Sequence, residues 1–164
     1  MARCLIIGCG CRGRSLARAL HSGGYAIRGT TRDPNNRGRI EAAGAEPFVG
    51  DPNLVGTLAG AVDHVSVACI LLGSAVGSAA QLTALHGSRL EMLLARMLDT
   101  TVRGVVYEAA GSVGPATLRT GATIVGTTCE GSSIPYELLA ADPRQHASWL
   151  HAAADAVERL LGAR

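Results

Sequence analysis

Residues 3–13 read RCLIIGCGCRG, an apolar run that passes directly into a glycine-rich turn. Arg3–Gly8 is predicted to form a buried β-strand, because a short continuous apolar run that ends at a glycine is typical of a strand covered on both faces. Arg14–Ser22 follows with apolar side chains at helical spacing, which predicts a helix. The stretch therefore indicates a strand, a tight turn and a helix in direct succession.

Three glycines of this turn, Gly8, Gly10 and Gly13, have the spacing G-x-G-x-x-G. Between a strand and a helix this spacing is typical of a dinucleotide site. The first glycine permits the turn, the second lets the backbone approach a pyrophosphate, and the third lets the helix pack on the sheet. The N-terminus of the helix also favours phosphates. We expect these glycines, Cys11 and Arg12 to bind the cofactor; the alternative is a structural turn without a ligand.

Strands and helices alternate along the rest of the chain. Further strands are expected at Tyr25–Thr31, Ala45–Val49, His64–Leu72, Val102–Tyr107 and Ala122–Thr127. Further helices are expected at Asn35–Ala43, Asn53–Gly60, Gln81–His86, Leu90–Leu98, Ile134–Ala141 and Ala147–Leu161. This alternation predicts an α/β fold of one domain, residues 1–164, with a doubly wound parallel six-stranded sheet in the Rossmann order 3-2-1-4-5-6 and a C-terminal helix.

The end of the second predicted strand indicates which dinucleotide is bound. Sites for NAD usually have an acidic residue here that holds the adenosine ribose. This chain has Thr30, Thr31 and Arg32 instead, and hydroxyl and guanidinium groups suit a 2′-phosphate. Asp33 follows one position later and could still turn toward a ribose. We expect NADP, bound by Thr31 and Arg32, with NAD as the alternative.

The stretch Leu5–Pro34 resembles the start of the atypical and extended short-chain dehydrogenases, the NAD-dependent epimerase-like proteins. Gly44–Asp51 and Asn53–Asp63 continue the likeness, which covers the cofactor half alone. The resemblance implies that Asp51, after the third strand, lies near the adenine. Gly73, after the fourth predicted strand, is also expected at the cofactor site, because ligands of this fold bind beyond the carboxyl ends of the strands.

The catalytic pair of that superfamily, Tyr-x-x-x-Lys, is absent. All fifteen basic residues are arginine, and Tyr107 is followed by Glu-Ala-Ala-Gly. Glu108 and Glu130 follow what are predicted to be neighbouring strands, so we expect both carboxylates in one cleft, where one could act as a general base. The alternative is that they cap helices or lie in solvent. Likewise, Cys129 is either a nucleophile or a buried thiol, and His86 either an acid or a helix-end residue.

Composition limits the partners and the setting of the chain. The net charge of +2 is too small to predict nucleic-acid binding. The sequence contains no run of about 18 apolar residues, so we expect no membrane span. Five cysteines without framework spacing indicate free thiols in the cytoplasm, and the histidines do not form a metal set. An apolar helical face, read either as core or as a homodimer contact, consists of Leu90, Leu93, Leu94, Met97 and Leu98.

Three functions fit these observations, and we expect the first. The first is a small NADP-dependent oxidoreductase or epimerase-like enzyme that acts on a small-molecule substrate held by the loops after the fourth to sixth strands. The second is a non-catalytic dinucleotide-binding module that senses redox state or regulates a partner. The third is a Rossmann domain for another ligand, such as a CoA-type pyrophosphate, in which Arg32 would be incidental. The polar residues after the later strands favour the enzyme, and the missing catalytic pair favours the module.

Overall fold

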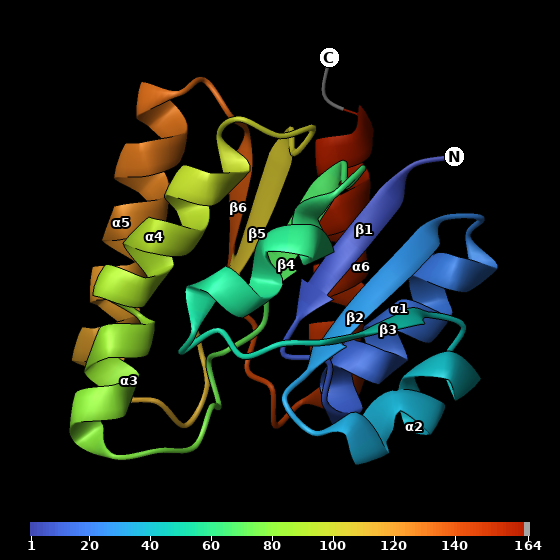
Figure 1. The fold of residues 1–164 in the computed structure, drawn as a ribbon, viewed down its shortest axis with the longest axis horizontal. Helices are drawn as coiled ribbons and strands as arrows, with labels where there is room; N and C mark the ends of the chain where they lie inside the picture. The colour runs from blue at the N-terminus through green and yellow to red at the C-terminus, as the bar shows by residue number, and fades with distance from the viewer. Residues whose placement is uncertain (163–164) are drawn as a thin grey trace.

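Six parallel strands form one sheet in the order β3-β2-β1-β4-β5-β6 in the computed structural model, which describes residues 1–162 (Figure 1). The strands are β1 (Arg3–Ile7), β2 (Ala26–Thr31), β3 (Glu46–Val49), β4 (Val67–Ile70), β5 (Gly104–Glu108) and β6 (Tyr136–Leu139). The predicted fold class and strand order are confirmed. Because the order reverses between β1 and β4, the carboxyl ends of these two strands flank the crevice in which such folds bind ligands.

Helices cover both faces of the sheet. They are α1 (Cys11–Ser22), η1 (Pro34–Asn36), α2 (Arg37–Ala42), η2 (Val55–Val62), α3 (Ala79–Leu85), α4 (Ser88–Met97), α5 (Pro115–Gly131) and α6 (His146–Gly162), where η marks a 3-10 helix. One face carries α1, α2 and α6, and the other carries η2, α3, α4 and α5 (Figure 1). Within residues 1–162 no helix is both long and apolar enough to cross a membrane.

The alternation of side chains along β1 divides the apolar interior into two cores. Cys4 and Ile6 pack against α1, α2 and α6, whereas Leu5 and Ile7 pack against the helices of the opposite face. The apolar face of α4 belongs to this second core, because Leu90, Leu93, Leu94 and Met97 are all buried there. Core packing therefore accounts for these four residues without a dimer contact. Leu98, at the end of the same face, is exposed.

The predicted sixth strand is wrong. Residues 122–127 lie inside α5, and β6 is formed instead by Tyr136–Leu139, within a segment predicted to be helical. The β-branched residues of 122–127 imitate a strand, but Gly121 lets α5 pack closely on the sheet, where a Cβ at this position would collide with the Tyr107 hydroxyl. Tertiary packing thus overrides local propensity. The strand order survives because β6 follows α5 on the same edge of the sheet.

Arg28 is a buried charge in the middle of β2. Its side chain is 8% exposed, and its guanidinium joins β2 to the end of η2. Nη1 donates to the carbonyl oxygens of Ala61 at 2.7 Å and Asp63 at 3.0 Å, and Nε donates to Glu46 Oε2 at 3.3 Å. The sequence of β2, AIRGTT, contains no signal for this role, because the accepting carbonyls lie more than thirty residues later in the chain.

Replacing Arg28 by methionine is expected to lower the free energy of unfolding by about 2 kcal/mol or more, since buried carbonyl oxygens lose their donor. Arg3→Met is the matched control, because Arg3 also pairs with Glu46 Oε2, at 3.2 Å, but on the surface. An exposed ion pair contributes about 0–1 kcal/mol. Urea denaturation of both variants measures the difference. Equal losses would contradict the role assigned to the carbonyl contacts.

Candidate functional site

The turn after β1 is held between its neighbouring strands. Gly8 has a positive φ of 83°, and a Cβ there would lie 2.5 Å from the carbonyl oxygen of Leu71, just past β4. On the other side, the Gly8 N–H donates to Thr30 Oγ1 at 3.2 Å, and the Cys9 N–H donates to the Thr30 carbonyl at 3.1 Å. A side chain at Gly8 would therefore meet both backbone strain and a collision. The first glycine of the loop is required by the fold.

The other two glycines of the loop differ from each other. A Cβ at Gly13 would lie 3.0 Å from the Gly8 carbonyl oxygen and 3.2 Å from Ile6 Cγ2, so α1 could not pack as closely on β1. A Cβ at Gly10 would have no protein atom within 4 Å, and the Gly10 φ of −81° suits any residue. Packing thus explains Gly13, whereas no contact or strain within the described structure explains a glycine at position 10.

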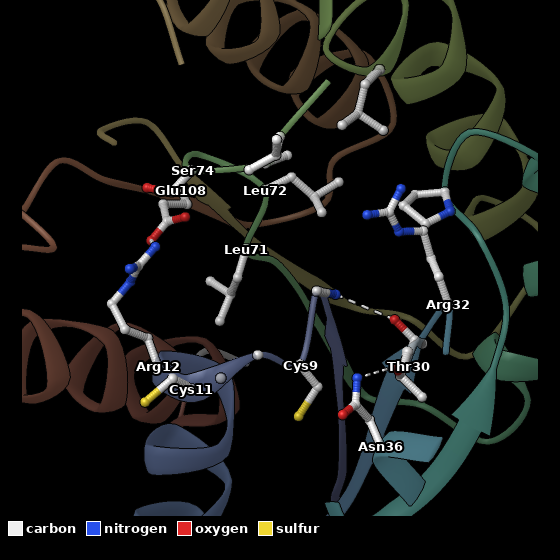
Figure 2. A pocket seen from close by; sticks show the side chains of 18 of the residues that line it. Cys9, Cys11, Arg12, Thr30, Arg32, Asn36, Leu71, Leu72, Ser74 and Glu108 are labelled. Carbon is white, nitrogen blue, oxygen red and sulfur yellow. Dashed lines mark hydrogen bonds and ion pairs between the residues drawn. The ribbon is translucent and has the colours of Figure 1, made fainter. Parts of the chain in front are cut away.

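A cavity of about 360 Å³ opens over this loop at the carboxyl ends of the strands. The glycine loop and the start of α1 form one wall, and the segments after β2, β3, β4 and β5, together with Trp149 of α6, form the others (Figure 2). The first turn of α1 has neither a side-chain cap nor an acidic residue, so its N–H groups present a positive end to the cavity. The structure brings these predicted site residues to the wall: Gly8, Gly10, Cys11, Arg12, Gly13, Thr31, Arg32 and Glu108.

The segment after β2 presents Arg32 to one side of the cavity (Figure 2). Arg32 is exposed, and within residues 1–162 its guanidinium is in no salt bridge. The Thr31 hydroxyl donates to the Asp33 carbonyl at 3.1 Å and accepts from the Asp33 N–H at 3.2 Å, which fixes the turn. Asp33 Oδ1 accepts from the Asn35 N–H at 2.9 Å and thereby caps η1. The cation, rather than the carboxylate, faces the cavity.

Two of the expected cofactor residues lie beside the cavity rather than on its wall. Asp51 Oδ1 accepts from the Asn53 N–H at 2.9 Å, and Asp51 lines a shallow hollow that shares Thr31 and Arg32 with the cavity. Gly73 has a packing role, because a Cβ there would collide with the Ala110 carbonyl oxygen. Gly73 contributes to the site through its backbone N–H, which donates a hydrogen bond to a side chain of β5 that lines the cavity.

That side chain is Glu108, which is fully buried at the end of the cavity away from Arg32 (Figure 2). Its Oε1 accepts from the Gly73 N–H at 2.8 Å, and its Oε2 accepts from Trp149 Nε1 at 3.0 Å. Arg12 Nη2 lies 3.9 Å from Oε2. Burial raises the pKa of Glu108, while the Arg12 charge and the two N–H donors act to lower that pKa.

The expectation that Glu108 and Glu130 share one cleft is wrong. Glu130 lies at the last turn of α5, where it is exposed and accepts a hydrogen bond from the Tyr136 hydroxyl at 2.7 Å, beside the start of β6. Glu108 lies at the end of β5, which runs parallel to β6. The two carboxylates therefore lie at opposite ends of these neighbouring strands. The error follows from the misplaced sixth strand, because only a strand ending near Glu130 would bring that residue to the cavity.

A buried histidine–tyrosine pair lies behind the cavity wall. Tyr107 Oη is 2.7 Å from His86 Nδ1, and His86 Nε2 is 3.0 Å from the Leu72 carbonyl oxygen. Because the carbonyl can only accept, Nε2 carries the proton, and Nδ1 accepts the Tyr107 O–H. Burial lowers the pKa of His86, so the imidazole is neutral in this pair. His86 therefore supports the segment after β4 instead of facing the cavity as an acid.

The buried cysteines are packed thiols. Cys9 Sγ lies against β2, where a Cβ at Gly29 would be only 2.6 Å away, and burial raises the pKa of the Cys9 thiol to about 11. Cys129 is also buried, and burial raises the pKa of its thiol to about 11. Such thiols are poor nucleophiles at neutral pH, which favours the buried-thiol interpretation of Cys129. Cys11, in contrast, is exposed and lines the cavity.

Sequence reasoning did not identify Trp149 as part of the site. This residue lies on α6, far along the chain from the glycine loop, yet it lines the cavity and donates to Glu108. The Arg12 guanidinium carbon lies 5.7 Å from the centroid of the indole ring. One signal was available, since Trp149 is the single tryptophan of a chain in which aromatic residues make up 3%.

Solved structures with this fold are numerous. A short-chain dehydrogenase/reductase superfamily protein from Agrobacterium tumefaciens with bound NAD matches with a TM-score of 0.68 and 20% identity, over 83% of this chain and 48% of that chain. A triphenylmethane reductase from Citrobacter sp. in complex with NADP(H) matches with a TM-score of 0.64 and 19% identity, over 84% of this chain and 48% of that chain. A UDP-glucuronic acid 4-epimerase from Bacillus cereus in complex with NAD matches with a TM-score of 0.63 and 14% identity, over 83% of this chain and 54% of that chain.

These similarities confirm, at the level of the fold, the resemblance that the first part of the sequence suggested. The chain spans about half the length of the solved structures it matches. No protein-family model matches the chain. No curated protein matches it either.

The contrast between two loop glycines can be tested with matched valine variants. Gly13→Val is expected to lower the free energy of unfolding by roughly 1–3 kcal/mol, because the side chain must displace the Gly8 backbone or Ile6. Gly10→Val is expected to lower the free energy of unfolding by about 1 kcal/mol or less, because the only cost is that valine is a poorer N-cap residue than glycine. Denaturant unfolding measures both. A Gly10→Val variant as unstable as Gly13→Val would show that the protein itself requires Gly10.

The His86–Tyr107 pair predicts a pH dependence of stability. The pKa of His86 is lower in the folded than in the unfolded chain, so the unfolded chain binds the proton first as the pH falls. The contribution of His86 to the free energy of unfolding is therefore present above the unfolded-state pKa and is lost on acidification. The stability gap between wild type and His86→Gln should narrow from pH 7 toward pH 5. His146→Gln, at an exposed position of α6, should show no such change.

Proposed function

We propose that this chain binds a nicotinamide dinucleotide, with the pyrophosphate against Gly10 and the first turn of α1. The observation that carries the proposal is the asymmetry of the glycine loop. Gly8 and Gly13 are explained by strain and packing, whereas at Gly10 a side chain would only enter the cavity. A backbone position without a side chain, facing the cavity at the positive end of a helix, lets a phosphate approach the backbone closely.

The identity of the adenosine phosphate is inferred from Arg32. An exposed guanidinium at the cavity wall, with Asp33 turned away to cap η1, suits the 2′-phosphate of NADP better than the ribose hydroxyls of NAD. The solved structures described above include two with NAD and one with NADP(H), which supports the ligand class, and the choice between the two cofactors rests on Arg32. NADP is therefore our proposed cofactor, with NAD as the weaker ligand.

Between a binding module and an enzyme, we infer that the module is the better supported. Glu130 is remote from the cavity, and both oxygens of Glu108 already accept hydrogen bonds. An oxidoreductase or epimerase-like activity on a small-molecule substrate is the second candidate, which the fold shared with a triphenylmethane reductase and a UDP-glucuronic acid 4-epimerase favours. Oxidation of NADPH in the presence of a panel of aldehydes, ketones and quinones, with Gly10→Val as the control, distinguishes the two.

Gly10→Val is expected to abolish binding of NADP and NAD while the protein stays folded, because the branched side chain would occupy the place of the pyrophosphate. Binding raises the unfolding midpoint of the wild type by mass action, so a thermal-shift titration with both cofactors provides the measurement. Circular dichroism of the variant controls for folding. Wild-type affinity in a folded Gly10→Val protein would remove the loop from the binding site.

Arg32→Ala is expected to weaken NADP about ten- to a hundred-fold and NAD little, because a charge-assisted hydrogen bond contributes roughly 1.5–3 kcal/mol. Arg39→Ala, at an exposed position of α2 outside the cavity, is the matched loss of charge. Calorimetric titration of each variant with each cofactor gives the ratio. If Arg32→Ala weakens both cofactors equally, the preference for NADP has another origin.

A further inference from the structure

The end of the cavity away from Arg32 holds an arginine whose hydrogen bonding is incomplete. Arg12 points toward Glu108 (Figure 2), with Nη2 3.9 Å from Oε2, which is too long for a hydrogen bond. Its Nε is buried and, alone among the buried side-chain nitrogen and oxygen atoms of residues 1–162, has no hydrogen-bond partner. The guanidinium lies near the Trp149 ring and lines the cavity. Arg12 is thus a cation placed for a further anion.

Glu108, in contrast, is closely held and depends on Arg12 for its charge balance. It is 0% exposed, its two oxygens accept from the Gly73 N–H and from Trp149 Nε1, and its ion pair is with Arg12. Neither N–H donor titrates. Tyr107, the neighbouring residue on β5, turns to the opposite face and stays neutral because burial raises its pKa. Arg12 on α1 is therefore the charged group that sets the ionisation of this carboxyl group.

We propose that dinucleotide binding is coupled to the uptake of one proton by Glu108. This inference rests on the proposed function. The pyrophosphate takes the Arg12 guanidinium as its own counterion, and the Glu108 carboxylate, which loses its positive partner, binds a proton from solvent at a carboxyl oxygen. No other bond forms or breaks. Glu108 and Arg12 together make the affinity for the cofactor depend on pH.

The direction of the coupling follows from the charges. Withdrawal of a cation and arrival of two phosphate charges both disfavour the carboxylate, and both act within a buried environment where charges are screened weakly. Burial already raises the pKa of Glu108 in the free protein, and Arg12 opposes that shift. The dinucleotide removes the opposing influence. By linkage, a protonated Glu108 favours the dinucleotide by the same factor as the dinucleotide favours protonation.

The test is isothermal calorimetry of the wild type with NAD⁺, between pH 6 and pH 8, in buffers of different ionisation enthalpy. NAD⁺ is the probe because the 2′-phosphate of NADP would itself titrate near pH 6. We expect net proton uptake that approaches one per NAD⁺ bound, and an affinity that falls by up to about tenfold per pH unit where Glu108 is ionised in the free protein. Glu108→Gln should bind NAD⁺ without proton uptake and with an affinity independent of pH.

Two further variants make the result specific. Arg12→Gln should also lose the proton uptake, because Glu108 without its counterion is already protonated before binding. If Glu108→Gln does not fold, Arg12→Gln is the variant that tests the coupling. Glu130→Gln removes an exposed carboxylate that lies away from the cavity and should keep the uptake. Uptake that disappears in Glu130→Gln, or persists in Glu108→Gln, would overturn the assignment.

Failure of the coupling is distinguishable from failure of the proposed function. A wild type that binds NAD⁺ without proton uptake, and with the same affinity across this pH range, overturns the coupling and leaves dinucleotide binding intact. A wild type that binds neither NAD⁺ nor NADP overturns both.

Discussion

The clamp on Gly8 is the constraint on which the rest of the site depends. Thr30 of β2 accepts the Gly8 N–H on one side, and the Leu71 carbonyl oxygen leaves no room for a side chain on the other. The turn therefore cannot shift toward either neighbouring strand. Because α1 begins three residues later, its N-terminus is aimed at the cavity by contacts within the sheet. The orientation of the helix dipole is thus built into the strand order, and a ligand does not have to impose it.

The two arginines on the cavity wall are in different dielectric surroundings, which suits them to different tasks. Arg32 is exposed, so its field is screened by salt and it acts on a ligand mainly through direct contact. The Arg12 side chain is 32% exposed and faces a fully buried carboxylate, so a change at one of these groups is felt strongly by the other. One end of the cavity is therefore suited to selecting between cofactors, and the other to linking their binding to protonation.

The sequence predicts what is local and misses what is assembled from distant segments. The first strand, glycine loop and helix could be predicted because each element has its own signal within Arg3–Ser22. The sixth strand was misplaced because the β-branched residues of α5 imitate a strand, and their helical state depends on the fit of Gly121 against Tyr107. The contact between Glu108 and Trp149 spans 41 positions, and no periodicity encodes it. Charge and residue type could identify Glu108 as unusual but could not find its partner.

The chain is poor in aromatic residues, and its two largest fully buried side chains, Trp149 and Tyr107, both act as hydrogen-bond donors. Trp149 donates to Glu108 on one face of β5, and Tyr107 donates to His86 on the other. Each pair joins a helix to the carboxyl end of the sheet: α6 through Trp149, and the end of α3 through His86. Rigid rings with one polar atom suit this task, because they pack like core residues and still satisfy a buried partner. The cavity wall is thereby fixed from both faces of the sheet, and the C-terminal helix contributes to a site that the first thirteen residues begin.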